Sequence, residues 1–232
     1  MEIGLIDAGA LTPSDRVLDI GCGVGRVAAP LTRVLKEGSY AGFDVVPDSI
    51  HWCQRRITRR HPNFTFQLAD IRNQMYNPTG QVSAAEFRFP YEDASFDLAF
   101  ANSVFTHLRP VETARYLSES ARVLRAGGRL VGTFFLLNDD VELALDRGIE
   151  RPALGGGGPL RLDLELEDDS GRRFRAAHPD VPEHRVALYE ADIPRLFEEA
   201  GLEITEVRTG DWWSHESVAD RLGQDLVVAT RP

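Results

Sequence analysis

The chain has 232 residues, of which 43% are hydrophobic, and a formal net charge of −10 at pH 7. This size and balance fit one soluble globular α/β domain and exclude a fibrous or wholly disordered chain. The excess of acidic residues argues against a nucleic-acid partner, because clustered lysine and arginine side chains bind a phosphate backbone. We therefore expect no nucleic acid among its partners.

No apolar run reaches the roughly 20 residues that a membrane-spanning helix needs. The N-terminal residues also lack the basic and apolar regions of a signal peptide. These features predict a cytoplasmic protein without a membrane span. Two cysteines, Cys22 and Cys53, are too few for a disulfide framework or a zinc site, so we expect reduced thiols.

Strand patterns and helix patterns alternate along the chain. Runs typical of buried strands cover residues 16–20, 40–44, 64–68, 96–101, 129–137, 202–207 and 225–230. Apolar residues at helical spacing predict helices over 24–36, 48–60, 110–124 and 191–200. The alternation predicts a doubly wound, Rossmann-like α/β fold, with a mostly parallel sheet and helices on both faces. No break divides the chain, so residues 1–232 are expected to form a single domain.

Two long segments, residues 72–90 and 138–188, interrupt the alternation. Loops of this length usually have a function or are disordered. In a doubly wound sheet the loops at the carboxyl ends of the strands surround the ligand crevice. We expect both insertions to form a lid and acceptor-binding region. Within the second, four glycines at 155–158 are typical of a flexible linker, and alternating leucines over 160–166 predict an extra strand or hairpin.

A glycine-rich turn joins the first predicted strand to the following helix. Its sequence, from residue 17, is Val-Leu-Asp-Ile-Gly-Cys-Gly-Val-Gly-Arg, with glycines at Gly21, Gly23 and Gly25. Glycines allow a ligand to approach the backbone closely and allow a positive φ. Several kinds of nucleotide-binding protein use such a turn, so the turn alone does not identify the ligand.

Two residues in this turn narrow the choice of cofactor. Arg26 stands where the dinucleotide fingerprint G-x-G-x-x-G has its third glycine. Asp19 precedes the glycines, and its carboxylate would repel a pyrophosphate at the helix N-terminus. S-adenosylmethionine carries an amino group and a sulfonium but no phosphate, so it is compatible with this acid.

Two further acids follow the next predicted strands. Asp44 ends the second strand about 20 residues beyond the glycines, where an acid binds ribose hydroxyls in nucleotide-binding α/β folds. Asp70 follows the third strand, in a position suited to an adenine amino group. Either acid could instead be a helix cap or a solvated loop residue. Acids at the ends of three successive strands nevertheless favour a cofactor site.

Together these motifs resemble class I S-adenosylmethionine-dependent methyltransferases over nearly the whole chain. The resemblance is carried by residues 17–26, 42–44, 69–71, 89–97 and 121–130. The last of these is similar to the family's R-x-L-K-P-G-G turn, with Ala126 in place of the usual proline. The resemblance implies a seven-stranded sheet whose final strand runs antiparallel.

The resemblance also implies roles for individual residues. Gly21, Gly23 and Gly25 are expected to pass under S-adenosylmethionine, which would leave as S-adenosylhomocysteine. Asp44 is expected to hold the ribose, and Asp70 with Ile71 to frame the adenine. We place Asp19, Arg26 and Asn102 among the cofactor-binding residues as well.

His107 is the best candidate for a catalytic base, because it follows the fourth strand, whose end faces the cofactor in this fold. The unperturbed pKa of histidine suits a base at neutral pH. The alternative is a histidine that only packs or hydrogen-bonds behind the site. Asp139 and Asp140 could join His107 around a divalent metal, but acids in an exposed loop are usually solvated, and we expect no metal.

Three aromatic residues are candidates for binding the acceptor. Trp212 and Trp213 lie between the last two strands, where they could stack against a sugar or an aromatic ring, or instead close the edge of the core. Tyr76 lies in the first insertion. These residues predict a small-molecule or saccharide acceptor.

One basic cluster stands out in the acidic chain: Arg55, Arg56, Arg59 and Arg60 on the predicted helix over 48–60. Ile50, Cys53 and Ile57 would face inward from the same helix. The spacing fits a solvated helix face, which is the interpretation we adopt.

Three functions remain open at this point. The preferred one is methyl transfer from S-adenosylmethionine to a small molecule or glycan by direct in-line displacement, most readily at a hydroxyl, with an amine or carboxylate as alternatives. A nicotinamide-dependent oxidoreductase and a non-catalytic module that binds S-adenosylmethionine are the other two. The sequence leaves a homodimer open.

Overall fold

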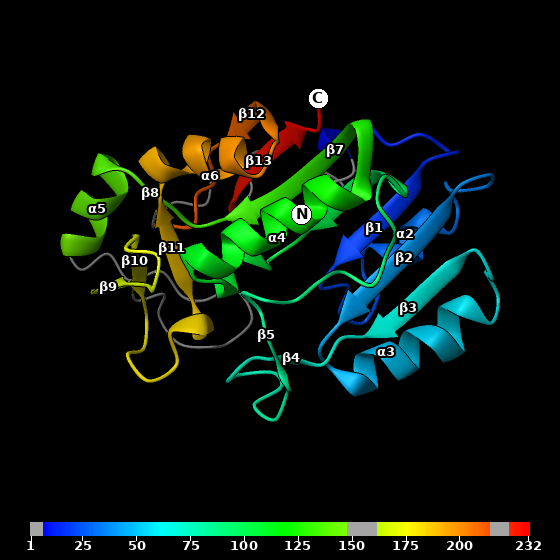
Figure 1. The fold of residues 1–232 in the computed structure, drawn as a ribbon, viewed down its shortest axis with the longest axis horizontal. Helices are drawn as coiled ribbons and strands as arrows, with labels where there is room; N and C mark the ends of the chain where they lie inside the picture. Colours follow the sequence, from blue (N-terminus) through cyan, green and yellow to red (C-terminus); the bar gives the residue numbers. More distant parts are fainter. Residues whose placement is uncertain (1–6, 148–161, 214–222) are drawn as a thin grey trace.

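The computed structural model describes residues 7–147, 162–213 and 223–232. Its main sheet has seven strands: β1 (Arg16–Ile20), β2 (Ser39–Asp44), β3 (Phe64–Leu68), β6 (Phe96–Ala101), β7 (Leu124–Phe134), β12 (Glu203–Arg208) and β13 (Asp225–Thr230). Their order is β12-β13-β7-β6-β1-β2-β3 (Figure 1). The pairs from β7 to β3 are parallel, whereas β13 runs antiparallel to both β7 and β12. The expected doubly wound sheet with an antiparallel last strand is confirmed.

Helices cover both faces of this sheet (Figure 1). One face carries α4 (Pro110–Val123) and α6 (Ile193–Glu199), and the other carries α2 (Ala28–Leu31) and α3 (Pro47–Cys53), which continues as the π-helix η1 (Gln54–Thr58). Each face has its own cluster of buried side chains. Neither these helices nor any other in the described ranges is long and apolar enough to cross a lipid bilayer.

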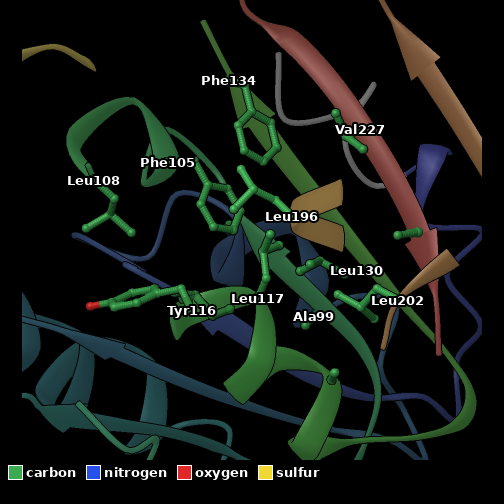
Figure 2. Close-up of a cluster of buried hydrophobic side chains, with 14 of the residues drawn as sticks. Ala99, Phe105, Leu108, Tyr116, Leu117, Leu130, Phe134, Leu196, Leu202 and Val227 are labelled. Carbon is green, nitrogen blue, oxygen red and sulfur yellow. The ribbon is translucent and has the colours of Figure 1, made fainter. Parts of the chain in front are cut away.

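The core under α4 and α6 is built from aromatic and aliphatic side chains of several elements (Figure 2). Phe105 and Phe134 stack with ring centroids 4.5 Å apart and an interplanar angle of 4°. Tyr116 packs at the margin of this cluster, and Figure 2 shows its hydroxyl pointing away from the other labelled side chains. The same tyrosine therefore belongs to the core through its ring and is free to contribute a polar group elsewhere.

Two helices differ from their expected lengths. The pattern over 24–36 forms an α-helix only at Ala28–Leu31, because Gly25 has a positive φ of 72° and Pro30 lacks the N–H that a longer helix needs. The predicted helix over 48–60 begins at Pro47, with Val46 at the N-cap position. Proline is favoured in the first turn since its missing N–H has no helical partner there.

Both insertions form small structures at the carboxyl end of the sheet. The first contains the short parallel pair β4 (Ile71–Arg72) and β5 (Val82–Ser83). The second contributes most of a four-stranded sheet in the order β8-β11-β10-β9, with β8 (Leu136–Leu137), β9 (Leu164–Glu167), β10 (Arg173–Ala176) and β11 (Val186–Tyr189). The strands β9 and β10 are the hairpin expected from the leucine alternation. The glycines at 155–158 lie outside the described residues.

Asp225 joins the main sheet to the small sheet. Its carboxylate, on the first residue of β13, accepts hydrogen bonds from the backbone N–H of Gly210 and Leu136, both at 2.8 Å, and from Trp212 Nε1 at 2.6 Å. Burial raises the pKa of Asp225, and the three donors partly offset this effect. One buried carboxylate thus holds together the starts of β8 and β13 and the segment after β12.

Asp225→Ala should lower the free energy of unfolding by about 3 kcal/mol, because three buried N–H groups lose their acceptor. Chemical denaturation followed by circular dichroism measures this. Glu206→Ala is the matched control, since it breaks only the exposed ion pair with Arg208 and should cost less than about 1 kcal/mol. Equal losses from the two substitutions would show that Asp225 does not join the sheets.

Candidate active site

A cavity of about 510 Å³ lies at the carboxyl ends of β1, β2 and β6. This volume is typical of a small-molecule site. Its wall has two origins. The strand ends contribute Asp19, Gly21, Gly23, Asp44 and Asn102, and the insertions contribute Arg72, Asn73, Tyr76, Ala84 and Glu183.

The glycine turn requires glycine for two different reasons. Gly21 and Gly23 line the cavity with φ values of 70° and 51°, in the left-handed region that favours glycine. A Cβ on Gly21 would also lie 2.6 Å from Cγ2 of Val104. Gly25 has a φ of 72° but does not line the cavity, and its Cβ would lie 2.8 Å from Cδ1 of Ile57. Gly25 therefore allows α3 and η1 to pack closely against the glycine turn. The other two glycines keep space open for a ligand.

The carboxyl group of Asp19 is buried at the end of β1, with only 1% of the residue exposed. It accepts a hydrogen bond from the Tyr40 hydroxyl. Burial raises its pKa to about 7, the Tyr40 hydrogen bond lowers it, and the nearby charge of Asp44 raises it further. Described residues offer this carboxyl no cationic partner, so a cation bound in the cavity would stabilise its charged form.

Asp44 holds the glycine turn in place from the end of β2. One oxygen accepts a hydrogen bond from Gly23 N–H at 2.8 Å, and the other accepts from Val46 N–H at 2.9 Å. A carboxylate has about four lone-pair positions, so each oxygen can still accept from a ligand hydroxyl. Asp44 also lines the cavity, as expected for a residue that binds ribose.

Asn102 follows β6 and lines the cavity. Its Oδ1 is buried and has no hydrogen-bond partner. The next residue, Ser103, has a positive φ of 57°, and its N–H donates to Thr133 Oγ1 at 2.7 Å. A buried oxygen without a partner costs free energy, and no described residue donates to Asn102 Oδ1, so this oxygen is available to a donor on a ligand.

Three other expected cofactor residues lie in different surroundings. Ile71 and Arg26 line the cavity, the former buried and the latter exposed. Asp70 does not line it, because its carboxylate turns to the backbone N–H of Gln81 at 3.3 Å. The contact of Asp70 with adenine stays a prediction.

His107 lies on the 3₁₀-helix η2 (Phe105–His107), in the wall of the cavity. Its Nδ1 is 2.9 Å from the carbonyl oxygen of Glu183, on the 3₁₀-helix η3 (Pro182–His184). A carbonyl can only accept, so Nδ1 carries the proton and Nε2 keeps the lone pair of a neutral imidazole. Burial lowers the pKa of His107, which favours this neutral form.

Tyr76 also lines the cavity, and its ring contacts His107 edge to face, with centroids 5.6 Å apart. Glu183, Tyr116 and Glu112 line it as well, although sequence reasoning did not single them out. Glu112 is buried and bound to Arg109 Nη2 at 2.7 Å, whereas Oε2 of Glu183 is buried without a partner. Glu183 lies 76 residues from His107, and no sequence pattern links the two.

The tryptophan pair does not reach the cavity. Trp212 is buried with Leu137, Val141 and Ala187 under the small sheet, and its indole N–H binds Asp225. Trp213 packs against the same cluster. Neither ring therefore lines this cavity, and both pack in or against the core.

The pair Asp139 and Asp140 lies in the first turn of α5 (Asp139–Asp146) and does not line the cavity. Carboxylates there suit the positive end of the helix dipole. Their position therefore has a structural reason that involves no ligand.

Asp19→Asn should raise the free energy of unfolding by about 1–3 kcal/mol at pH 8, because it replaces a buried charge and keeps an oxygen for the Tyr40 hydroxyl. The folded-state pKa lies above the unfolded one, so the wild type loses stability as pH rises toward 7. The increase in the free energy of unfolding caused by Asp19→Asn should therefore be larger at pH 8 than at pH 5. Urea unfolding at both pH values measures it. A loss of stability at pH 8 would contradict the proposed environment of Asp19.

The chain is similar to several known proteins. Residues 17–128 match the model of a methyltransferase domain. Over 121 residues the chain is 36% identical to phthiotriol/phenolphthiotriol dimycocerosates methyltransferase 1 of Mycobacterium ulcerans, a match that covers 51% of this chain and 36% of the relative. Over 124 residues it is 35% identical to a fatty-acid O-methyltransferase of Mycolicibacterium smegmatis, covering 53% of this chain and 36% of that protein.

The fold recurs in solved structures. A SAM-dependent methyltransferase from Methanosarcina mazei superposes with a TM-score of 0.59 at 20% identity, over 97% of this chain and 96% of the other. At this identity the likeness concerns the fold. The match to the family model covers residues 17–128, a region that contains the glycine turn, Asp19, Asp44 and His107. Residues 17–128 are thus similar to a methyltransferase domain, and the seven-stranded sheet that contains them has the fold of S-adenosylmethionine-dependent methyltransferases.

Proposed function

We propose that this protein transfers the methyl group of S-adenosylmethionine to a hydroxyl group of a small, largely apolar acceptor. The observation that carries the proposal is the position of His107 in the cavity wall, with Nδ1 held by the Glu183 carbonyl and Nε2 left as a base. The chain spans 36% of the length of the two curated relatives described above, so acceptor and activity are inferred from the site itself.

The residues around the cavity fit the cofactor. Asp19 would pair with its amino group, since this buried carboxyl has a raised pKa and needs a cation. Asp44 would bind the ribose hydroxyls, Ile71 would pack on the adenine, and Asn102 Oδ1 would accept from a polar hydrogen. Bound there, the sulfonium supplies an activated methyl group whose transfer needs alignment above all.

A hydroxyl acceptor must lose a proton as its oxygen attacks the methyl carbon. The new C–O bond forms as the C–S bond breaks, and the electron pair of that bond goes to sulfur. The hydroxyl proton goes to Nε2 of His107. The Glu183 carbonyl then stabilises the resulting imidazolium through Nδ1. General-base assistance of this kind is typically worth about 10²–10⁴-fold.

The wall on the insertion side favours an apolar acceptor with a hydrogen-bond donor. Ala84 supplies apolar surface there, and Val104 and Leu108, on either side of η2, extend it. Oε2 of Glu183 is buried without a partner, so a nearby donor would be stabilised and a second carboxylate repelled. The names of the two relatives refer to dimycocerosates and to a fatty acid, and they support a lipid-like methyl acceptor for this protein.

Methylation of a carboxylate is the second candidate. It is favoured by the name of the fatty-acid O-methyltransferase and by Arg26 and Arg72 in the cavity wall, which could pair with an acid. A carboxylate has no proton to lose at neutral pH, so this reaction would not need His107. The two candidates therefore differ in a measurable way.

The first test is transfer of a labelled methyl group from S-adenosylmethionine to pooled long-chain alcohols, phenols, amines and fatty acids. We expect label in base-stable ethers from the alcohol or phenol pool. Label only in base-labile esters would replace the proposal with carboxyl methylation. Label in no pool, with S-adenosylhomocysteine bound, would favour a non-catalytic module.

His107→Asn keeps a side-chain N–H for the Glu183 carbonyl but removes the base. It should lower kcat for a hydroxyl acceptor by about 10²–10⁴-fold and leave the Kd for S-adenosylhomocysteine unchanged. Steady-state kinetics and calorimetry measure the two effects. A variant with normal kcat would show that His107 only packs beside the site.

Cofactor affinity should depend on pH through Asp19. Its pKa of about 7 in the free protein means that below this pH a proton must leave before the carboxylate can pair with the cofactor amino group. The Kd for S-adenosylhomocysteine should then rise about tenfold for each pH unit below 7. Titration calorimetry from pH 5 to pH 8 measures it, with Asp19→Asn as the control that loses both affinity and pH dependence. A flat profile in the wild type would contradict this pairing.

A further inference from the structure

The segment formed by α3, η1 and the two residues after it carries positive charge that no ion pair among the described residues neutralises. Residues 47–60 contain four arginines and a single acid, Asp48. All four, Arg55, Arg56, Arg59 and Arg60, are exposed. No ion pair joins any of them to an acid within the described ranges 7–147, 162–213 and 223–232.

Many of the arginines elsewhere do form ion pairs. Twelve of them, from Arg16 to Arg208, form ion pairs with Asp or Glu. In a chain of net charge −10, acids are abundant, yet none lies against this cluster in the described structure. The cluster is therefore available to an external anion.

Trp52 stands within this cluster. Its side chain is exposed, at 42%, whereas Trp212 is buried. Together with Arg55, Arg56 and Arg59 it lines a surface hollow of about 430 Å³. An exposed tryptophan beside arginines is typical of the interface between water and lipid, where the ring enters the headgroup region and the cations bind phosphates.

Apolar side chains extend this surface toward the cavity. Six of the nine exposed large apolar residues of the described structure belong to the glycine turn, to α3 or to the stretch from the end of β3 to β5: Val24, Trp52, Leu68, Met75, Tyr76 and Val82. Val24 and Tyr76 also line the cavity, and Val82 pairs with Ile71, which lines it too. Trp52 lies one helical turn beyond Ser49, another lining residue.

The overall arrangement can be followed in Figure 1, where α3 and the β4–β5 segment both lie along the lower edge of the view. Leu68 ends β3, against which α3 and η1 pack, and β4 follows within three residues. Chain continuity thus joins the arginine cluster to the apolar rim of the cavity.

We propose that this surface, made of Trp52, Arg55, Arg56 and Arg59 with the apolar rim of Leu68, Met75, Tyr76 and Val82, docks the protein on a lipid bilayer that contains anionic phospholipids. Arginines bind the headgroup phosphates, and the apolar side chains enter the interface. The cavity mouth then lies at the bilayer surface, where an apolar acceptor can enter it without crossing water.

The chemistry favours a bilayer over other anionic partners. A nucleic acid would meet the phosphate-binding arginines but would leave the rim of apolar side chains without a partner. At long range the net charge of −10 repels any polyanion, so attraction operates only within about 8 Å, the screening length at physiological salt. Docking therefore depends on direct contact by both the arginines and the apolar rim.

Sedimentation with phosphatidylcholine vesicles, with and without phosphatidylglycerol, tests the proposal without requiring turnover. The wild type should bind only the vesicles that contain phosphatidylglycerol, and binding should weaken as salt rises. The triple variant Arg55→Gln, Arg56→Gln, Arg59→Gln should bind about 100-fold more weakly. Both proteins should retain the same Kd for S-adenosylhomocysteine, because these arginines lie outside the cavity.

A matched control removes the same charge elsewhere. Arg88→Gln, Arg173→Gln, Arg195→Gln replaces three arginines with side-chain exposures of 68%, 63% and 75%, and should bind vesicles no more weakly than the wild type. Equal binding to both vesicle types, or equal binding by the cluster variant and the wild type, would overturn the proposal. Binding of a DNA duplex or self-association that the cluster variant abolishes, without vesicle binding, would also overturn it.

Discussion

A buried carboxyl group to which the described residues offer no cation lies beside the glycine turn of this structure. Asp19 is the last residue but one of strand β1, buried between the Tyr40 hydroxyl and the glycine turn, with Asp44 on the neighbouring strand. Burial of this acid is unfavourable for the empty protein, as its raised pKa indicates. The surrounding features, from the positive φ values of the glycines to the two hydrogen bonds on Asp44, keep a space beside this carboxyl open. A cationic ligand is the partner that the site lacks.

The two sides of the cavity have different origins. The cofactor side is built by strand ends that the sheet itself holds in register, so its geometry follows from the fold. The acceptor side depends on the insertions, through Tyr76 from the first and Glu183 from the second. One fold can support many reactions, and the chemistry is decided by the residues grafted onto it. The contact between His107 and the Glu183 carbonyl is where these two sides meet.

Much of the fold could be predicted from the sequence because buried parallel strands are continuous apolar runs with clear ends. The strands from β1 to β13 in the main sheet lie at or near their expected residues. The helix expected over 24–36 is shorter because a local break, Gly25 and Pro30, outweighs its apolar spacing. In the site, Asp19 and Asp44 were predictable since each acid lies at or next to the carboxyl end of a strand.

Other features of the site depend on contacts between distant parts of the chain. Trp212 looked suited to a sugar, but Asp225 and the small sheet bury it, and neither effect is visible in its local sequence. The Asp70 carboxylate turns to Gln81, on the far side of the β4–β5 segment. The partner of His107 comes from an insertion whose path no local pattern specifies. Such contacts require the three-dimensional structure.

The central claim is that Asp19 pairs with the amino group of a bound S-adenosyl cofactor. The most direct test compares, by titration calorimetry, the affinities of S-adenosylhomocysteine and 5′-methylthioadenosine, which shares the nucleoside but lacks the amino-acid portion. The account predicts that methylthioadenosine binds at least about 100-fold more weakly, since a charge-assisted pair in a buried site is lost. Equal affinities, or stronger binding of NAD than of either compound, would contradict it.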